Sequence, residues 1–396
     1  MNTCPNCTHS ALEPFYEIHN IPVHSVLLIR DQKKARTFPR GDLHLAVCTH
    51  CGFITNTAFD ASLLQYSHAY EETQGFSPTF SAFHRRLAQM LIRRHHLYNK
   101  RIIEIGCGKG EFLTLLCEEG NNEGIGFDPA YVPGRIPPPE RGKVTFIEDF
   151  YSQKYASFTA DFICCKMTLE HIPHTAHFLR TVRQAIGNAL NTRVFFQIPE
   201  TLRILKEEAF WDLYYEHCSY FSPVSLRYLF ESQGFQVADL WTDYDDQYLM
   251  IDALPSPPPY PEATVQPEEL RQLLHAVQVF RQHIPDKLHQ WRDWLASMRQ
   301  QEKKIMLWGG GSKAVAFLTT LGLTDEVMGA VDINPFKRNT FLPGSGHQVY
   351  SPDDLPLLKP DVVLVMNPIY TSEIRHMLQE KGLHPVLQPV TEPLPH

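Results

Sequence analysis

A glycine-rich turn within residues 101–116 (RIIEIGCGKGEFLTLL) constrains the fold of this 396-residue chain more than any other stretch. Three isoleucines before the turn indicate a buried strand, and the apolar spacing after it indicates a helix. Gly106, Gly108 and Gly110 permit positive φ angles and the close approach of a ligand. The helix would present free N–H groups and the positive end of its dipole to that ligand. The stretch therefore predicts a strand–turn–helix unit of the kind that binds cofactors.

Two classes of cofactor are bound by turns of this kind. The dinucleotide fingerprint G-x-G-x-x-G/A needs a small third residue, and this chain has Glu111 there. The pattern Glu-x-Gly-x-Gly-x-Gly, which begins at Glu104, instead resembles motif I of the class I S-adenosylmethionine (SAM) methyltransferases. The alternative is a tight strand–helix turn beside an incidental acidic residue.

Two further acidic positions are in register with this resemblance. The next predicted strand (residues 123–127) ends at Asp128, where an acidic residue can hold both ribose hydroxyls. The strand after it (residues 144–147) is followed by Asp149, where members of this family contact the adenine. The resemblance implies SAM as the cofactor, bound by Glu104, Gly106, Gly108, Gly110, Asp128 and Asp149.

Length and charge set the class of protein. A chain of 396 residues predicts two or three domains. Its net charge of −8 gives no general affinity for nucleic acids or anionic membranes. No apolar run approaches the length of a membrane span, and residues 1–10 lack a secretory signal pattern. We therefore expect a soluble, cytoplasmic enzyme for a small-molecule substrate, as a monomer or weak homodimer.

Four of the nine cysteines form two C-x-x-C pairs, Cys4 with Cys7 and Cys48 with Cys51. This spacing predicts a tetrahedral Cys4 zinc site. A closed four-thiolate site leaves no position for a catalytic water, so we expect the zinc to be structural. The alternative, two redox pairs, lacks a thioredoxin-like context.

The centre of the chain alternates predicted strands and helices, which predicts a mostly parallel sheet with helices on both faces. We expect three domains: a zinc-binding unit with a connector (residues 1–75), a SAM domain (76–254) and a C-terminal unit (255–396). Ligands of such sheets bind beyond the carboxyl ends of the strands. The fold class is therefore α/β, with a Rossmann-like SAM domain between the two smaller units.

Three segments near the expected ligand carry polar side chains. The connector contains Tyr66 and Tyr70, which either line a substrate pocket or pack in a solvated linker. His171 follows the fourth strand of the SAM domain and either lines the site or has a capping or core role. The densest cluster, residues 210–222, follows the fifth strand. It contains Tyr214, Glu216, His217 and Tyr220, a set that can supply a base, a carboxylate and oxyanion donors.

The C-terminal unit begins after a proline-rich boundary with six prolines in residues 255–267. We expect a helical hairpin next, residues 267–283 and 286–304, broken at Pro285. Residues 309–314 fit G-x-G-x-x-A, and a later strand ends at Asp332. These residues predict a second Rossmann-like unit, and the pattern alone permits a dinucleotide.

The combination of these parts resembles the sugar C-methyltransferases that act on nucleotide-linked keto-deoxysugars. The resemblance covers essentially the whole chain, and residues 214–222 match the active-site motif of that family. It implies that His217 is the base, that Tyr214 and Glu216 lie in the sugar pocket, and that Tyr70 or Tyr66 belongs to the tyrosine-bearing segment. It also implies that the C-terminal unit holds the nucleotide sugar, with Lys313 in a phosphate cradle.

Some residues differ from the family pattern. The late strand is followed by residues 366–370 (MNPIY), where the sugar enzymes have a Leu-Pro-Trp type sequence. The substrate can therefore be another small metabolite, methylated on oxygen, nitrogen or carbon. A redox or binding protein that uses the C-terminal fingerprint for NAD is the remaining alternative.

Overall fold

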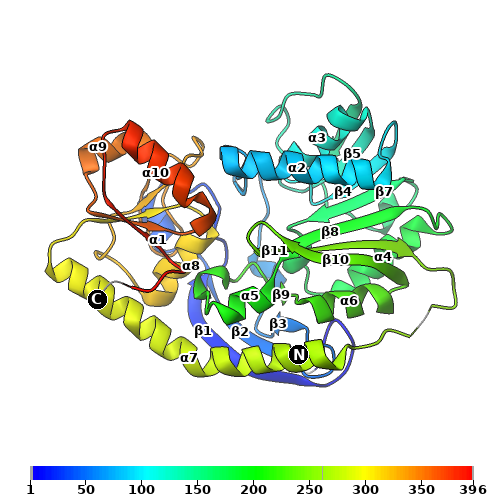
Figure 1. The fold of residues 1–396 in the computed structure, drawn as a ribbon, viewed down its shortest axis with the longest axis horizontal. Helices are drawn as coiled ribbons and strands as arrows, with labels where there is room; N and C mark the ends of the chain where they lie inside the picture. Colours follow the sequence, from blue (N-terminus) through cyan, green and yellow to red (C-terminus); the bar gives the residue numbers. More distant parts are fainter. Residues whose placement is uncertain (1–2, 261, 395–396) are drawn as a thin grey trace.

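The computed structural model describes residues 3–260 and 262–394, arranged around three β-sheets. In Figure 1 the seven-stranded sheet lies on the right, the five-stranded C-terminal sheet on the left, and the blue N-terminal strands below and between them. A single long helix, α7, runs along the lower edge of the molecule and links the two larger units. The three units therefore meet at the centre of the molecule.

The first sheet is antiparallel and has the order β1-β2-β3-β9. Its strands are β1 (Leu12–Pro22), β2 (Arg40–Cys48), β3 (Ile54–Asn56) and β9 (Ser219–Tyr220), and helix α1 (Gln32–Arg36) joins the first two. β9 comes from the histidine-containing cluster far along the chain, and its Tyr220 pairs with Ile54. The N-terminal sheet therefore fixes the backbone next to His217.

The central sheet has the order β6-β5-β4-β7-β8-β11-β10, which is the strand order of class I methyltransferases. Its strands are β4 (Arg101–Ile105), β5 (Glu123–Phe127), β6 (Lys143–Ile147), β7 (Phe162–Lys166), β8 (Arg193–Pro199), β10 (Phe235–Asp243) and β11 (Tyr248–Pro255). The first five are parallel, and β11 runs antiparallel to both neighbours. The fold class predicted from the sequence is confirmed.

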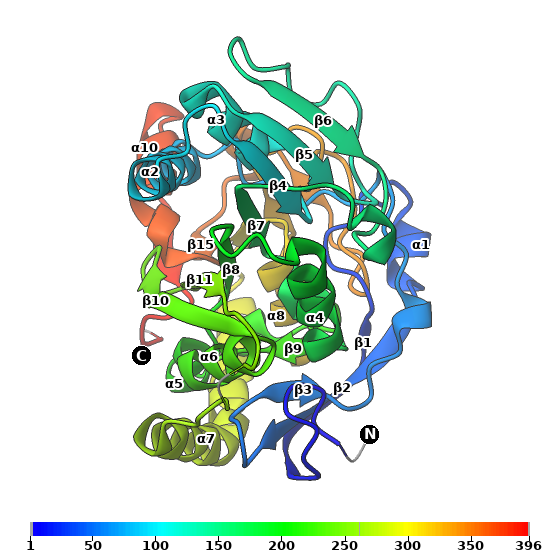
Figure 2. The same cartoon turned by 90° about the vertical axis from the view of Figure 1, so that its right-hand side faces the viewer.

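Alternating side chains bury both faces of this sheet, as expected for a parallel sheet between helices. Phe162 and Cys164 pack in the core formed with α2 (Pro78–His95) and α3 (Glu111–Gly120). Ile163 and Cys165 pack in the opposite core, formed with α4 (Thr175–Ile186) and α6 (Pro223–Ser232). Figure 2 shows α4 and α6 on one side of the sheet and α2 and α3 on the other. The carboxyl ends of the strands remain as the edge at which a ligand can bind.

The C-terminal sheet is parallel throughout, with the order β14-β13-β12-β15-β16. Its strands are β12 (Ile305–Trp308), β13 (Ala330–Val331), β14 (Val349–Tyr350), β15 (Val362–Val365) and β16 (Val386–Pro389). Its helices are α8 (Ser312–Leu321), α9 (Leu355–Leu358) and α10 (Thr371–Glu380). This sheet confirms the second Rossmann-like unit.

The helical hairpin expected around Pro285 is wrong, because α7 (Pro267–Gln300) is one helix of 34 residues with Pro285 inside it. Pro285 removes the hydrogen bond to the carbonyl of Arg281, but both residues are exposed, so water can satisfy that carbonyl. The buried face continues on both sides of the proline, through Phe280, Ile284 and Trp291. Packing along this face therefore outweighs the local break.

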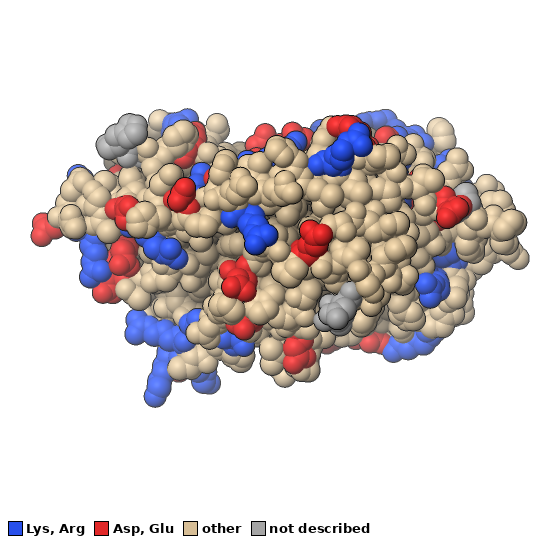
Figure 3. Space-filling model, turned by 90° about the horizontal axis from the view of Figure 1, so that it is seen from below, with Lys and Arg blue, Asp and Glu red and all other residues tan. Residues whose placement is uncertain are grey.

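The surface carries charges of both signs on the face seen from below (Figure 3). Among the residues that the structure describes, no helix combines the length and apolarity that a bilayer span requires. On the face shown in Figure 3, lysines and arginines are interspersed with aspartates and glutamates.

The remaining helix, α5 (Thr201–Lys206), packs against α7 and leads into the histidine-containing cluster.

Candidate active site

A cavity of about 1060 Å³ lies at the carboxyl ends of the central strands and reaches the C-terminal sheet. The candidate residues that line it are Tyr66, Tyr70, Glu104, Gly106, Gly108, Asp128, Asp149, His171, Tyr214, His217 and Lys313. Gly110, Glu216 and Tyr220 are not among its lining residues. The tertiary structure therefore brings the predicted SAM turn, the histidine-containing cluster and the C-terminal glycine loop to one cavity.

The turn after β4 has the geometry that a closely bound cofactor requires. Gly106 and Gly108 adopt φ angles of 70° and 54°, and a side chain at Gly106 would collide with Thr168. Asp128 fixes the turn, because its carboxylate accepts the Gly108 amide at 2.9 Å and the Ala130 amide at 2.7 Å. Gly110 is the N-terminal cap of α3 and packs against Phe146 rather than facing the cavity.

The acidic position after β6 lies at another part of the cavity wall. Asp149 forms an ion pair with Lys154, and its carboxylate accepts a hydrogen bond from the Tyr155 hydroxyl at 2.7 Å. These contacts lower the pKa of Asp149, so its carboxylate is ionised at neutral pH. It can accept a hydrogen bond from a ligand amino group.

His217 is surrounded by aromatic rings. It is 4% exposed, and its Nδ1 has no hydrogen-bond partner in the described part of the chain. The Tyr214 ring lies 4.1 Å from the His217 ring, and the His171 ring meets it edge-on at 4.8 Å. Burial, with a smaller contribution from the positive charge of Lys313, holds the pKa of His217 well below its ordinary value. The imidazole is therefore neutral and able to accept a proton.

His171 is fixed by the connector. Its Nδ1 lies 3.2 Å from the Tyr66 hydroxyl, and burial lowers its pKa to about 4. The Tyr70 ring lies 5.2 Å from the Tyr66 ring. The connector tyrosines, which the sequence left between two interpretations, thus line the cavity beside the two histidines.

Glu216 and Tyr220 support the cluster from behind the cavity. The Glu216 carboxylate, 1% exposed, accepts His24 Nδ1 at 2.9 Å, the Ser25 amide at 2.8 Å and the Ser25 hydroxyl. Burial raises the pKa of Glu216, but the hydrogen bonds from His24 and Ser25 and nearby positive charge lower it overall. The Tyr220 hydroxyl donates to the Tyr214 carbonyl at 3.3 Å. Both residues therefore hold the backbone that carries Tyr214 and His217.

Glu170 directly precedes His171 in the loop after β7, and its place at the carboxyl end of that strand made it, like His171, a possible site residue from the sequence. It lines the cavity, and neither carboxylate oxygen has a hydrogen-bond partner among the described residues. Burial raises the pKa of Glu170 to about 8. Glu170, His171 and His217 offer donor atoms within 4.8 Å of one another. A neutral carboxyl group thus lies beside the candidate base, and its only sequence signal was its place after a buried strand.

The C-terminal glycine loop is built like the SAM turn. Asp332 accepts the Gly310 amide at 2.9 Å and the Asn334 amide at 2.8 Å, as Asp128 does in the first turn. Asp332 also pairs with Lys337 at 3.1 Å. Lys313 pairs with Asp212, whose other oxygen accepts Arg203 at 2.7 Å. The loop therefore presents two groups to the cavity: the Lys313 ammonium group, which Asp212 fixes in place, and the N-terminus of α8.

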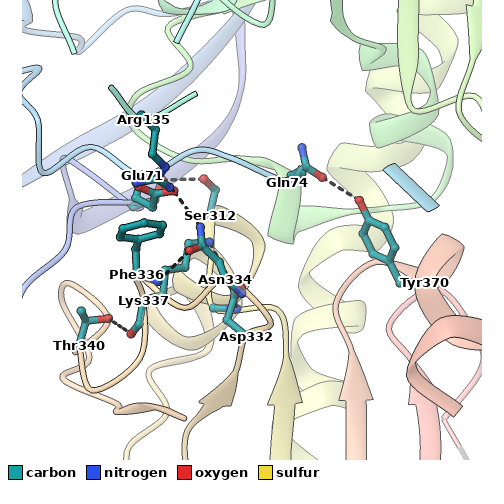
Figure 4. Close-up of polar contacts among 12 residues, drawn as sticks. Glu71, Gln74, Arg135, Ser312, Asp332, Asn334, Phe336, Lys337, Thr340 and Tyr370 are labelled. Carbon is teal, nitrogen blue, oxygen red and sulfur yellow. Dashed lines mark hydrogen bonds and ion pairs between the residues drawn. The ribbon is translucent and has the colours of Figure 1, made fainter. Parts of the chain in front are cut away.

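A buried carboxylate joins the SAM domain to the C-terminal unit (Figure 4). Glu71, 1% exposed, accepts Arg135 at 2.7 Å and the Asn334 side chain at 2.8 Å. The Arg135 guanidinium lies 3.4 Å from the centre of the Phe336 ring. Arg135 belongs to a proline-rich loop at residues 133–139. This loop therefore bridges the two units beside the cavity.

The four N-terminal cysteines fit a zinc ion. All four are buried, and their sulfurs lie 3.8 Å apart for Cys4 and Cys51 and 3.5 Å apart for Cys7 and Cys48. A tetrahedral zinc with bonds of about 2.3 Å places its sulfurs about 3.8 Å apart. The Asn6 side-chain NH2 group donates to the Cys51 sulfur at 3.7 Å, a contact that would stabilise that sulfur as a thiolate ligand. Zinc is therefore suggested by the donor set and its spacing.

Comparisons with known proteins agree with this geometry. A family model described as a methyltransferase domain matches residues 70–240, and one described as a C-methyltransferase C-terminal domain matches residues 262–384. The C-methyltransferase NovU of Streptomyces niveus is 24% identical over 99% of this chain and 96% of its own length. The chain is therefore a SAM-dependent methyltransferase. The second domain narrows this class to methyltransferases that carry a C-methyltransferase C-terminal domain.

Other similar proteins match only part of the chain. A ubiquinone biosynthesis O-methyltransferase of Yersinia enterocolitica is 28% identical over 27% of this chain and 48% of its own length. The crystal structure of magnesium protoporphyrin IX methyltransferase from Synechocystis PCC 6803 is 14% identical. It covers 45% of this chain and 84% of its own, with a TM-score of 0.34, too low for a conclusion about this chain.

Proposed function

We propose that this enzyme transfers a methyl group from SAM to the carbon next to the carbonyl of a nucleotide-linked keto-deoxysugar. The observation that carries the proposal is His217, a buried neutral imidazole in the same cavity as the SAM turn. A carbon acceptor must lose a proton before it attacks a methyl group, and a neutral imidazole can accept that proton. The match of residues 214–222 to the sugar C-methyltransferase motif supports the sugar as substrate.

The chain has the groups that SAM requires. Glu104, Gly106, Gly108, Asp128 and Asp149 would hold it, since the glycines leave room for close approach and the carboxylates face the cavity. SAM supplies a methyl group already activated by its sulfonium. The protein therefore has to supply positioning and one base.

In the proposed reaction, His217 removes the proton from the acceptor carbon. Tyr214 or Tyr70 donates a hydrogen bond to the enolate oxygen. Burial raises the pKa of both tyrosines well above its ordinary value, so both hydroxyls stay protonated and can donate. The substrate carbon then attacks the methyl group, and S-adenosylhomocysteine (SAH) leaves.

We assign the remaining candidates to the substrate. Tyr66 and His171 line the sugar end of the cavity beside His217. Lys313, at the N-terminus of α8, would hold the diphosphate of the nucleotide. Glu216 and Tyr220 would act by positioning, because neither lines the cavity.

The test is mass spectrometry of the protein incubated with methyl-labelled SAM and a panel of nucleotide-linked 4-keto-deoxysugars. We expect the label on a carbon atom of the sugar. We also expect exchange of that carbon's hydrogen with deuterium from D2O without SAM. His217→Asn should abolish both the methylation and the exchange while SAM binding persists. His289→Asn, an exposed histidine on α7, is the matched control.

Three results would each contradict a part of the proposal. Wild-type turnover by His217→Asn would remove His217 from the mechanism. A label on oxygen or nitrogen, with no solvent exchange, would make the enzyme an O- or N-methyltransferase. Label on another carbonyl metabolite, with exchange, would keep the base and change the substrate.

We also propose that Cys4, Cys7, Cys48 and Cys51 hold a structural zinc ion. The support is the sulfur spacing and the closed donor set, which leaves no site for a substrate. Metal analysis of the purified protein should find stoichiometric zinc, and Cys48→Ser should lose it.

A further inference from the structure

Two buried polar groups without partners lie close together at the candidate acceptor site. Glu170 is 2% exposed, and neither of its carboxyl oxygens has a hydrogen-bond partner in the described part of the chain. His217 is 4% exposed, and its Nδ1 is likewise unpartnered there. The two side chains offer donor atoms within 4.8 Å of each other. Because buried polar groups are nearly always hydrogen-bonded, an unpartnered pair at this distance indicates a function.

The backbone holds the two side chains next to each other. Glu170 belongs to a short 3-10 turn that follows β7, and His217 precedes the short strand β9. The Glu170 carbonyl accepts the Cys218 amide at 3.0 Å, and the Ile172 carbonyl accepts the Ser219 hydroxyl at 2.7 Å. These bonds join the two loops directly beside His217. The distance between Glu170 and His217 is therefore set by the fold and does not depend on a bound ligand.

The imidazole of His217 has one ring nitrogen for the substrate and one for Glu170. Of the two nitrogens, only Nδ1 is buried without a partner, which leaves Nε2 as the nitrogen open to the cavity. A neutral imidazole carries one N–H, so a base at Nε2 requires the proton on Nδ1. Glu170 is the carboxyl group beside this ring. Hydrogen bonds of this kind commonly shorten when the substrate binds.

Glu170 is also the stronger proton acceptor of the two. Burial raises the pKa of Glu170 to about 8, whereas burial holds the pKa of His217 well below its ordinary value. An imidazole this weakly basic cannot keep a proton taken from carbon, but it can pass the proton on to a carboxylate of higher pKa.

The other groups around the pair do not change charge near neutral pH. They are His171 of the same turn, Tyr66 of the connector, Cys165 of β7, Tyr214 and Cys218 of the histidine-containing cluster, and Tyr248 of β11. Burial raises the pKa of these tyrosines and thiols and lowers that of His171 to about 4. Lys313 acts on His217 and Glu216 acts on His171, both as fixed charges of ion pairs or hydrogen bonds.

We propose that Glu170 and His217 act as a dyad, in which His217 Nε2 takes the proton from the acceptor carbon and the Nδ1 proton passes to a Glu170 carboxylate oxygen. The C–H bond breaks, its electron pair stays on the substrate as the enolate, and Glu170 becomes a carboxylic acid. Methyl transfer then consumes the enolate, and Glu170 loses its proton to water, so each turnover releases one proton. Glu170 acts only through His217 and is therefore a positioning residue that also stores the proton. The inference rests on the proposed role of His217 as the base but not on the identity of the sugar.

The first test is the pH profile of deuterium exchange at the acceptor carbon, measured without SAM so that cofactor binding does not enter. In the wild-type protein the rate should rise with pH up to about 8, because the dyad accepts a proton only when Glu170 is ionised. Glu170→Gln should lower exchange and the kcat of methyl transfer about 100-fold and lose this rise. The KM for the sugar and the affinity for SAH should stay within about threefold, because Glu170 acts on the base and not on either ligand.

Two further variants complete this test. Glu170→Asp keeps a carboxylate and should recover part of the rate together with the rise with pH. Glu380→Gln, at an exposed position of α10, is the matched control and should change nothing. Glu72 and Glu104 also line the cavity, and burial raises their pKa values to about 7 and about 8. The rise is therefore assigned to Glu170 by its loss in Glu170→Gln.

A second measurement needs no substrate. Heteronuclear NMR of the protein with isotope-labelled histidines reports the protonation of each ring nitrogen. The signals of His217 are identified by their loss in His217→Asn. They should shift as the pH passes about 8, because Glu170 ionises beside the ring, and this shift should be absent in Glu170→Gln.

Four outcomes would overturn the inference. The first is wild-type exchange and kcat in Glu170→Gln, and the second is a flat pH profile of exchange in the wild type. The third is an equal loss in Glu170→Gln and Glu170→Asp with weaker binding of SAH, which would show a merely structural role. The fourth is a bound transition metal, beyond any held by the four cysteines, that Glu170→Gln loses, since the cluster would then be a metal site.

Failure of the proposed function is distinguishable from these outcomes. Wild-type turnover by His217→Asn would remove the base and the dyad together. Absence of exchange and methyl transfer with every sugar, with the NMR shift as expected, would refute only the proposed substrate.

Discussion

Replacing Glu216 by glutamine tests whether this residue acts on the substrate or holds the site from behind. Its carboxylate accepts three donors, one from His24 and two from Ser25. His24 Nε2 accepts the Gln65 amide at 2.9 Å, so the His24 proton must be on Nδ1, facing Glu216. A glutamine has one acceptor oxygen, and its NH2 group would face the N–H of either His24 or Ser25. Neither orientation satisfies all the donors.

The cost follows from this count. The variant loses one hydrogen bond to a charged group, about 1.5–3 kcal/mol, and leaves a buried donor unsatisfied. Because these losses overlap, we expect the segment to open more easily by about 3 kcal/mol, which is roughly 150-fold. Hydrogen exchange measured by mass spectrometry should be faster by this factor in two places. These are the loop that follows β1, which contains His24 and Ser25, and residues 214–218. Binding of SAH should stay within about threefold, because Glu216 does not line the cavity.

The control is Glu268→Gln on α7, which removes an exposed ion pair with Arg271. Such pairs contribute about 0–1 kcal/mol, so exchange should be unchanged. The reasoning would be refuted if Glu216→Gln left exchange at His24 and residues 214–218 as in the wild type while methyl transfer fell about 100-fold. Glu216 would then contact the substrate.

Three further predictions follow from the described contacts. Removal of zinc with a chelator, or Cys48→Ser, should release β1–β3 to limited proteolysis while the central sheet stays resistant; equal resistance throughout would show that the metal is dispensable. Affinity for SAH should rise with pH up to about 8, because the ligand's ammonium group needs an ionised Glu104. Burial raises the pKa of Glu104 to about 8, a shift that Lys166 opposes and that Asp128 and Glu111 increase. A flat pH profile in the wild type would contradict this, and Glu104→Gln should give a flat profile. Asn334→Ala leaves the buried Glu71 with Arg135 alone, so thermal unfolding should show a loss of about 1–3 kcal/mol, and an unchanged midpoint would show that the bridge adds no stability.

Local pattern was sufficient for most of the fold. The strands at residues 101–105 and 123–127, the glycine turn between strand and helix, and the paired cysteines each have a signature that acts over a few residues. Such signatures work because buried parallel strands need continuous apolar runs, tight turns need glycine, and zinc needs ligands at close spacing. The same reasoning placed His217 beyond the carboxyl end of a strand.

Where local rules and long-range packing disagreed, the packing prevailed. Pro285 predicts a break, but the buried face of α7 continues on both sides of it. β9 is two residues long and pairs with Ile54, a partner that no local pattern can identify. The energy that decides both features comes from contacts between residues far apart in the sequence.

The chemistry of the site divides in the same way. By itself the sequence determined which side chains are available: the SAM turn, the histidine-containing cluster and the C-terminal glycine loop. Only the tertiary structure decided which of them face the cavity, turning Glu216 toward His24 and away from it. It also brought Lys166 and Glu104 to one face and Arg135 to Glu71. Charge, burial and proton affinity depend on neighbours in space, and the fold alone supplies those neighbours.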